Sequence, residues 1–142
     1  MITPAPTTKI DPKLCRGVLE QIVPESATKP AYIVISVPNT SYQIHLLGTA
    51  GGEIGKTIVG TVRAKARRID VVQSGGRYLE PVFGRPRRIQ GSIVAIDGSS
   101  VVVNAGVPVH VEPTDPRQSA GGFQVGQFIS FDALDGATFT QA

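Results

Sequence analysis

The chain has 142 residues, with 14 Lys and Arg against 11 Asp and Glu, so its formal net charge is +3. This length suits one domain or two very small ones and excludes a multidomain enzyme. Val, Ile and Thr are abundant, Leu is scarce, and 16 Gly with 11 Pro mark many turns, so the composition excludes a helical bundle and favours a folded all-β protein.

Residues 1–13 contain three prolines and three threonines, and we expect them to form a flexible N-terminal tail outside the core. The segment has neither the basic nor the apolar region of a signal peptide, and no apolar run in the chain is long enough to cross a bilayer. Cys15 is the single cysteine, which excludes an intrachain disulfide and a cysteine-ligated zinc site. We therefore expect a cytoplasmic protein that does not enter a membrane.

From Leu14 onward, short apolar runs alternate with turn signals and predict a series of strands. The predicted strands cover residues 14–23, 32–37, 42–47, 57–72, 78–83, 89–96, 101–103, 107–111 and 128–134. Asp97-Gly98 lies between two alternating runs and is the strongest hairpin signal. Only residues 117–122 and the neighbourhood of Ala50 leave room for a short helical turn.

The chain also resembles itself, with the order of the similar segments preserved. Segments 17–22, 33–35, 44–46 and 54–58 return as 91–96, 101–103, 109–111 and 125–129. A β-rich chain can align with itself by chance, but an ordered series of matches favours internal duplication. We predict two units in tandem, residues 14–88 and residues 89–142.

A glycine in the first strand, two alternating strands, a loop and then Val-Gly-x-Phe-Ile-x-Phe resemble the small antiparallel β-barrels of the OB and SH3-like type. The S1-like RNA-binding domains belong to this group. Residues 16–59 and 90–134 carry the pattern. The resemblance implies an all-β fold built from small barrels. S1-like domains usually have aromatic residues on their binding strands, whereas the first-strand positions here are aliphatic.

Charge is concentrated in residues 56–88, which hold nine basic and two acidic residues, a local net charge of +7. Within this basic ribbon, Arg63, Lys65 and Arg67 alternate with small apolar residues, so a strand would direct three cations to one side. Alternate strand positions lie about 6.6 Å apart, close to the roughly 7 Å between phosphates of an extended nucleic-acid strand. The Arg67-Arg68 pair interrupts the alternation and predicts a bulge.

Gly84-Arg85-Pro86-Arg87-Arg88 resembles the Gly-Arg-Pro core of AT-hook peptides, which lies in the minor groove of A·T-rich DNA. The resemblance implies that Arg85 enters the groove while Arg87 and Arg88 contact phosphates. The alternative interpretation is a structured basic loop.

These features predict non-catalytic, largely sequence-independent binding of nucleic acid or another polyanion. The predicted contacts are Arg63, Lys65, Arg67, Arg68, Arg77, Arg85, Arg87 and Arg88. Tyr78 and Phe83 are candidates either for base stacking or for the core. The alternative function is a structural or assembly module, in which exposed strands pair with a partner or with copies of the chain and the basic ribbon meets an acidic protein surface.

Other chemical signals are weaker. Residues 50–57 fit a relaxed phosphate-loop pattern, but a strand rather than a helix is expected to follow. His45 and His110 occupy corresponding places in the two units, and without cysteine partners or close spacing we expect them to face solvent. Asp115, Asp132 and Asp135 have no convergent base and nucleophile. We therefore predict that the protein is not an enzyme and has no metal site and no cofactor.

Overall fold

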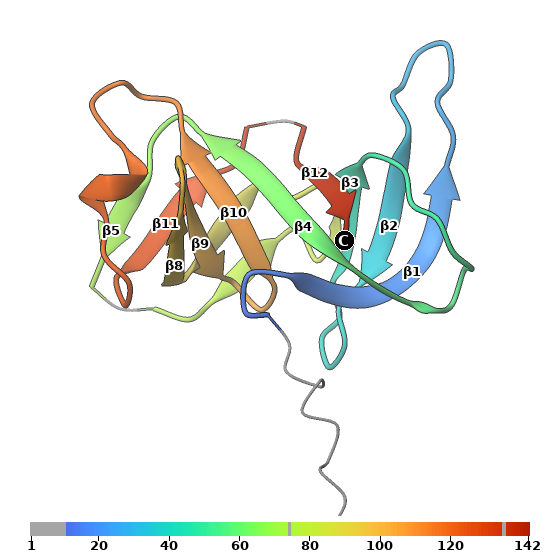
Figure 1. Cartoon of the computed structure of the whole chain (residues 1–142), viewed down its shortest axis with the longest axis horizontal. Helices are drawn as coiled ribbons and strands as arrows, with labels where there is room; N and C mark the ends of the chain where they lie inside the picture. The colour runs from blue at the N-terminus through green and yellow to red at the C-terminus, as the bar shows by residue number, and fades with distance from the viewer. Residues whose placement is uncertain (1–10, 74, 135) are drawn as a thin grey trace, which may run out of the picture.

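The computed structural model describes residues 11–73, 75–134 and 136–142. The fold is all-β, as the composition predicts, and the described residues contain one short helical turn, η2, at Ala120–Gly122 (Figure 1). The strands are β1 (Cys15–Val23), β2 (Tyr32–Ser36), β3 (Gln43–Leu47), β4 (Thr57–Ala66), β5 (Asp70–Val72), β6 (Tyr78–Glu80), β7 (Phe83–Gly84), β8 (Arg88–Asp97), β9 (Ser100–Asn104), β10 (Pro108–Pro113), β11 (Phe128–Asp132) and β12 (Thr138–Gln141). Most of the predicted tail, residues 1–10, and Asp135 lie outside the described residues.

The hairpin predicted at Asp97-Gly98 is confirmed. β8 and β9 pair antiparallel, and Asp97 is the register partner of Ser100. Gly98 has a φ of 63°, a left-handed conformation that glycine adopts without steric cost. The helical turn η2 lies within residues 117–122, one of the two places where the sequence leaves room for such a turn.

The single strand predicted over residues 57–72 is interrupted, and the interruption is a gap between β4 and β5 rather than a bulge. The backbone leaves the sheet after Ala66 because a crossing loop takes up its hydrogen bonds. Thr114 N donates to Ala66 O at 2.8 Å, and Asp115 N donates to Arg67 O at 3.1 Å. The side-chain amide of Gln118 bonds both backbone groups of Ile69, accepting from its N–H at 2.9 Å and donating to its carbonyl at 2.7 Å.

The first four strands form a closed circuit of pairings together with β12, the last strand of the chain. β1 pairs with β2, β2 with β3, β3 with β12, β12 with β4, and β4 again with β1. A second series runs from β4 through β10, β9 and β8 to β11, and the bridge between Ala66 and Ala133 returns it to β4. Figure 1 shows β4 crossing between these two groups of strands. Each circuit therefore contains strand residues from the other part of the chain.

The two circuits have the same register at corresponding positions. In β1–β2, Leu19 pairs with Ile35, and in β8–β9, Ile93 pairs with Val103, at offsets of 74 and 68 residues. Both pairs have a register irregularity directly after this position. The hydrogen bonds beside it also correspond. Leu19 N donates to Lys56 O at 3.0 Å, and Ile93 N donates to Gln127 O at 2.8 Å.

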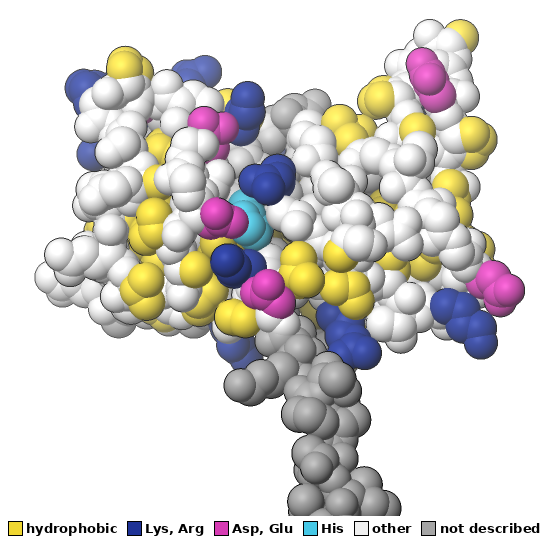
Figure 2. All heavy atoms as spheres, viewed as in Figure 1, with side chains coloured by type: hydrophobic (Ala, Val, Ile, Leu, Met, Phe, Trp, Pro, Cys, Tyr) yellow, Lys and Arg dark blue, Asp and Glu magenta, His cyan; other side chains and the backbone are white. Residues whose placement is uncertain are grey.

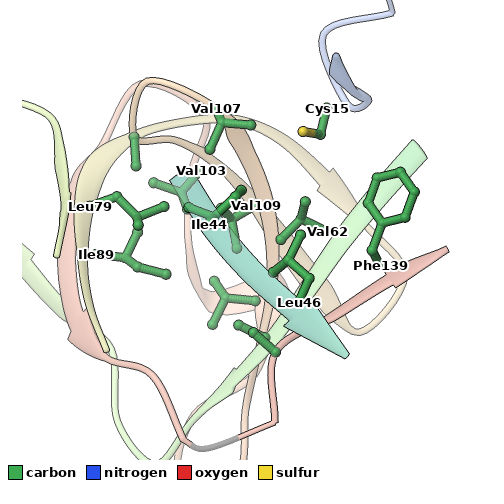
Figure 3. Packing of buried hydrophobic residues seen from close by; sticks show 14 of the residues in the cluster. Cys15, Ile44, Leu46, Val62, Leu79, Ile89, Val103, Val107, Val109 and Phe139 are labelled. Atoms are coloured by element: carbon green, nitrogen blue, oxygen red, sulfur yellow. The ribbon is translucent and has the colours of Figure 1, made fainter. Parts of the chain in front are cut away.

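One hydrophobic core extends through both circuits. Ile44 and Leu46 of β3, Val62 of β4 and Val109 of β10 lie in the same buried cluster (Figure 3). Cys15 is buried in this cluster, and burial raises the pKa of its thiol to about 12, so the thiol stays protonated. Within the described ranges, no helix has the length and apolar character needed to cross a membrane.

Candidate nucleic-acid interface

Two members of the predicted row of cations, Arg63 and Lys65, lie on β4. Arg63 and Lys65 are exposed, whereas Ala64 and Ala66 are buried, so alternation along the strand separates a charged outer face from an apolar inner face. Arg67 follows directly after the end of β4 and is also exposed. We call Arg63, Lys65 and Arg67 the β4 row. Consecutive members on the strand lie about 6.6 Å apart along the chain.

Strand β10 places a histidine and a carboxylate beside the β4 row. The parallel register pairs Arg63 with His110 and Lys65 with Glu112. His110 is only 3% exposed, so the prediction that it faces solvent is wrong. The backbone of Lys13 covers it: Nε2 lies 2.9 Å from the Lys13 carbonyl oxygen. A groove of about 320 Å³ lies here. Its lining includes the two register pairs named above, together with Ser99, Ser100 and Thr138.

The segment from Asp132 to Leu134 connects the β4 row with the predicted basic loop. Leu134 N donates to Lys65 O, and on the other side Ala133 N donates to Arg87 O, both at 2.7 Å. Arg87 is exposed. Lys65 and Arg87 therefore border the same short segment, although more than 20 residues separate them in the sequence.

Two of the predicted contact residues are already bonded to carboxylates. Arg68 Nε lies 3.1 Å from Asp70 Oδ1. Arg88 donates to Asp132 Oδ1 at 2.8 Å and to Ser130 Oγ at 3.0 Å, with a longer bond to the Tyr78 hydroxyl at 3.4 Å. The hydrogen bond to Asp132 is the main cause of the raised pKa of Arg88, followed by the bond to Tyr78. Arg68 is therefore tied to the first residue of β5, and Arg88 of β8 is tied to side chains of β6 and β11.

The remaining predicted residues lie in three different places. Arg87 borders the Asp132–Leu134 segment, and Arg77 is exposed directly before β6. Arg85 lines a different groove, beside His45. Within the part of the chain that the structure describes, no carboxylate lies within ion-pair distance of Arg63, Lys65, Arg67, Arg77 or Arg87. The space-filling view nevertheless shows Asp and Glu side chains interspersed with Lys and Arg over β4 and β10 (Figure 2).

An aromatic groove lies on β2 and β3 and was not found from the sequence. The rings of Tyr32 and His45 are stacked, with centroids 5.5 Å apart and planes inclined by 17°. Phe83 of β7 meets His45 edge-on at 4.8 Å and is 63% exposed. Burial, and then the charge of Arg85, lowers the pKa of His45. The groove has a volume of about 300 Å³ and is lined by Thr28, Lys29, Pro30, Tyr32, His45, Leu46, Leu47 and Arg85.

The weaker chemical signals gain no support from the geometry. The phosphate-loop-like segment ends in β4, with Gly55 N donating to Leu19 O at 2.7 Å as part of a turn into the strand. Asp115 is bonded by Arg117, which lowers the pKa of its carboxyl to about 2. Among the residues that the structure describes, no group of three or more His, Cys, Asp or Glu side chains is arranged to hold a metal ion.

Comparison with known proteins adds no family to these observations. No protein-family model and no curated protein matches the sequence. The functional interpretation therefore rests on the geometry of this chain.

Proposed function

We propose that the protein binds nucleic acid non-catalytically, through phosphate contacts along the β4 row. The observation that carries this proposal is that Arg63 and Lys65 are exposed at alternate positions of a strand whose other face is buried, and that exposed Arg67 follows directly after the end of the strand. Such a row matches the repeat of a phosphate backbone and makes no contact that distinguishes one base from another. Arg87 lies on the other side of the Asp132–Leu134 segment and adds an exposed cation next to the β4 row. The proposed binding is therefore largely independent of sequence.

We further propose that the fold consists of two small barrels of the OB or SH3-like type in tandem. The support for this proposal is that strand pairs at corresponding positions of the two circuits have the same register. Gly17 pairs with Ile58 between β1 and β4, and Gly91 pairs with Ile129 between β8 and β11, at offsets of 74 and 71 residues. A chance self-similarity has no reason to preserve register across several strand pairs. Duplication of one unit explains it. The reduced, buried thiol of Cys15 is consistent with the proposed cytoplasmic location.

A salt titration of binding tests the proposal directly. For duplex DNA, log affinity falls with log salt concentration by about 0.9 for each phosphate contact. We expect Arg63→Ala/Lys65→Ala to lower the steepness of this dependence by about 2 and to weaken binding to different sequences equally. Fluorescence anisotropy with labelled duplexes of unrelated sequence measures both quantities.

The matched control is Arg16→Ala/Lys56→Ala, which makes the same change in net charge at two exposed positions outside the β4 row. It should leave the salt dependence close to that of the unchanged protein. Equal losses in the two variants would show that net charge, rather than the row, governs binding. Absence of binding at low salt would reject the proposed function.

A second candidate function, assembly through exposed strands, is favoured by β5. This strand lies at one end of the sheet and pairs only with β11 among the described strands. Val71 at its centre is 55% exposed, although it is β-branched and apolar. An edge of this kind can accept a strand from another chain. Light scattering that shows a stable oligomer, together with no binding to DNA or RNA at low salt, would support this candidate instead.

A further inference from the structure

The aromatic groove on β2 and β3 combines stacked rings with positive charge. Tyr32 and His45 supply nearly parallel rings, and Pro30 and Leu47 supply apolar walls. Both charged side chains in the lining, Lys29 and Arg85, are cations, and no carboxylate is among the described residues that line it. A flat ring that carries a negative group has the complementary chemistry.

His45 lies at the centre of this arrangement and is uncharged near neutral pH, because burial and Arg85 lower its pKa. Its Nε2 is buried and has no hydrogen-bond partner within the described structure. A neutral imidazole stacks on another aromatic ring without the cost of desolvating a charge.

The groove and the β4 row lie on the same outer face of the sheet. Leu47 of β3 is the register partner of Thr138 of β12, and Thr138 is the partner of Arg63 of β4. Partners in register point to the same side of a sheet, and neighbouring strands are about 4.8 Å apart. Leu47, one of the residues that line the groove, is therefore about 10 Å from Arg63 across the sheet.

We propose that this groove is a nucleotide-binding site, in which the base stacks on the ring pair formed by Tyr32 and His45 and the phosphate faces Lys29 and Arg85. The site goes beyond the proposed function, since the β4 row recognises phosphates alone and the groove recognises a base attached to a phosphate. The nucleotide is either free or an unpaired nucleotide of a strand. Both sources present the same chemistry to the groove.

Titration with adenosine monophosphate, followed by NMR of the Tyr32 and His45 ring resonances, tests the proposal. We expect saturable shifts of both rings with adenosine monophosphate and none that saturate with ribose 5-phosphate at the same ionic strength. A single-stranded oligonucleotide and a matched oligonucleotide with abasic positions form the second arm. Shifts with adenosine monophosphate identify the free nucleotide as a ligand, and shifts only with the base-bearing oligonucleotide identify the strand.

Two variants link the readout to the groove. Tyr32→Leu removes the stacking ring and should weaken binding of the base-bearing ligand at least about fivefold, because stacking one base on an aromatic ring contributes about 1–3 kcal/mol. Lys29→Ala changes an exposed loop residue and should weaken binding without affecting the fold. Lys56→Ala makes the same charge change away from the groove and should bind as the unchanged protein does.

The proposal is overturned if neither base-bearing ligand shifts the rings, if the base-free ligands produce the same saturable shifts, or if Tyr32→Leu folds and binds normally. Its failure is distinguishable from failure of the proposed function. If only the groove proposal fails, binding to duplex DNA and its dependence on Arg63 and Lys65 are still observed. If only the proposed function fails, the response of the rings to adenosine monophosphate is still observed.

Discussion

Two glycines occupy equivalent places in the circuits, and both lie against the backbone of a neighbouring strand. A β-carbon on Gly17 would contact Ile35 and would lie 2.7 Å from the Ser36 carbonyl oxygen. A β-carbon on Gly91 would overlap the Asn104 carbonyl oxygen. Since Ser36 and Asn104 are held in paired strands, neither backbone can retreat. Glycine is required at these positions for close approach, not for an unusual turn.

We predict that Gly91→Ala lowers the free energy of unfolding by about 3 kcal/mol or more, because the overlap is with fixed backbone. Gly17→Ala should cost less, since a side-chain methyl of Ile35 is one of its obstacles. Urea unfolding followed by circular dichroism measures both. Gly121→Ala is the control: nothing lies within 4 Å of its added carbon, and its stability should change little.

The lowered pKa of His45 makes stability depend on pH in a defined direction. The unfolded chain, with an ordinary histidine pKa of 6.5, binds a proton more readily than the folded chain. The stabilisation is therefore present above this value and is lost as the pH falls towards the folded-state pKa. We predict that the unchanged protein loses more stability between about pH 7.5 and 5 than His45→Gln does.

Urea unfolding at both pH values measures the difference, and all other titratable groups are common to the two proteins. An equal loss in the two proteins would show that His45 does not titrate differently on folding. Adenosine monophosphate bound in the groove would add a second effect, so the measurement is made without it.

At the scale of elements, the gap between β4 and β5 depends on the side chain of Gln118. Its amide replaces a neighbouring strand, bonding the N–H and the carbonyl of Ile69, which is buried. These two hydrogen bonds fix the backbone at Ile69, directly after Arg67 and Arg68 in the sequence, and so help to position both arginines. A polar side chain far away in the sequence thus determines where the cation row ends.

We predict that Gln118→Ala lowers the free energy of unfolding by about 1–3 kcal/mol, because two backbone groups of a buried residue lose their partners. Gln118→Glu should also destabilise, since a carboxylate can accept from the Ile69 N–H but cannot donate to its carbonyl. Gln21→Ala, at an exposed position, is the control. Thermal unfolding of the three variants decides whether Gln118 has this role. A Gln118→Ala variant as stable as the control would contradict it.

The sequence predicted the features that depend on local pattern. Alternation of small apolar and basic residues predicted the exposed faces of Arg63 and Lys65, and Asp97-Gly98 predicted a hairpin. The gap after Ala66 was not predicted, because its cause is a loop about 50 residues later. The aromatic groove was not predicted either. Tyr32, His45 and Arg85 come from separate segments, and no local pattern brings them together.

At the scale of the whole molecule, the two circuits are interleaved. Thr138 of β12 pairs with Leu47 in the first circuit, and Lys65 of β4 pairs with Glu112 in the second. Phe139 of β12 is buried in the common core. The predicted boundary between residues 88 and 89 falls at the start of β8, but strand pairs on both sides of it join the two parts. Hydrogen bonding and apolar burial are therefore shared between them.

We predict that fragments 1–88 and 89–142 do not fold separately, because each lacks a strand segment that completes its circuit and would expose an unpaired edge. Produced together, they should associate into a complex with the spectrum of the intact chain. Two-dimensional amide NMR of each fragment and of the mixture provides the measurement. Well-dispersed spectra from either fragment alone would contradict the prediction and would favour independent units.

The parallel contact between β3 and β12 also sets an order of events during synthesis. On the ribosome, β3 and β4 emerge long before residues 138–141 have been translated, an interval on the order of several seconds at ordinary elongation rates. Throughout that time the first circuit is open, and the nascent chain exposes two strand edges and the apolar site of Phe139. Completion of the first circuit is therefore a late step, and until then the exposed edges of the growing polypeptide are open to association with other chains.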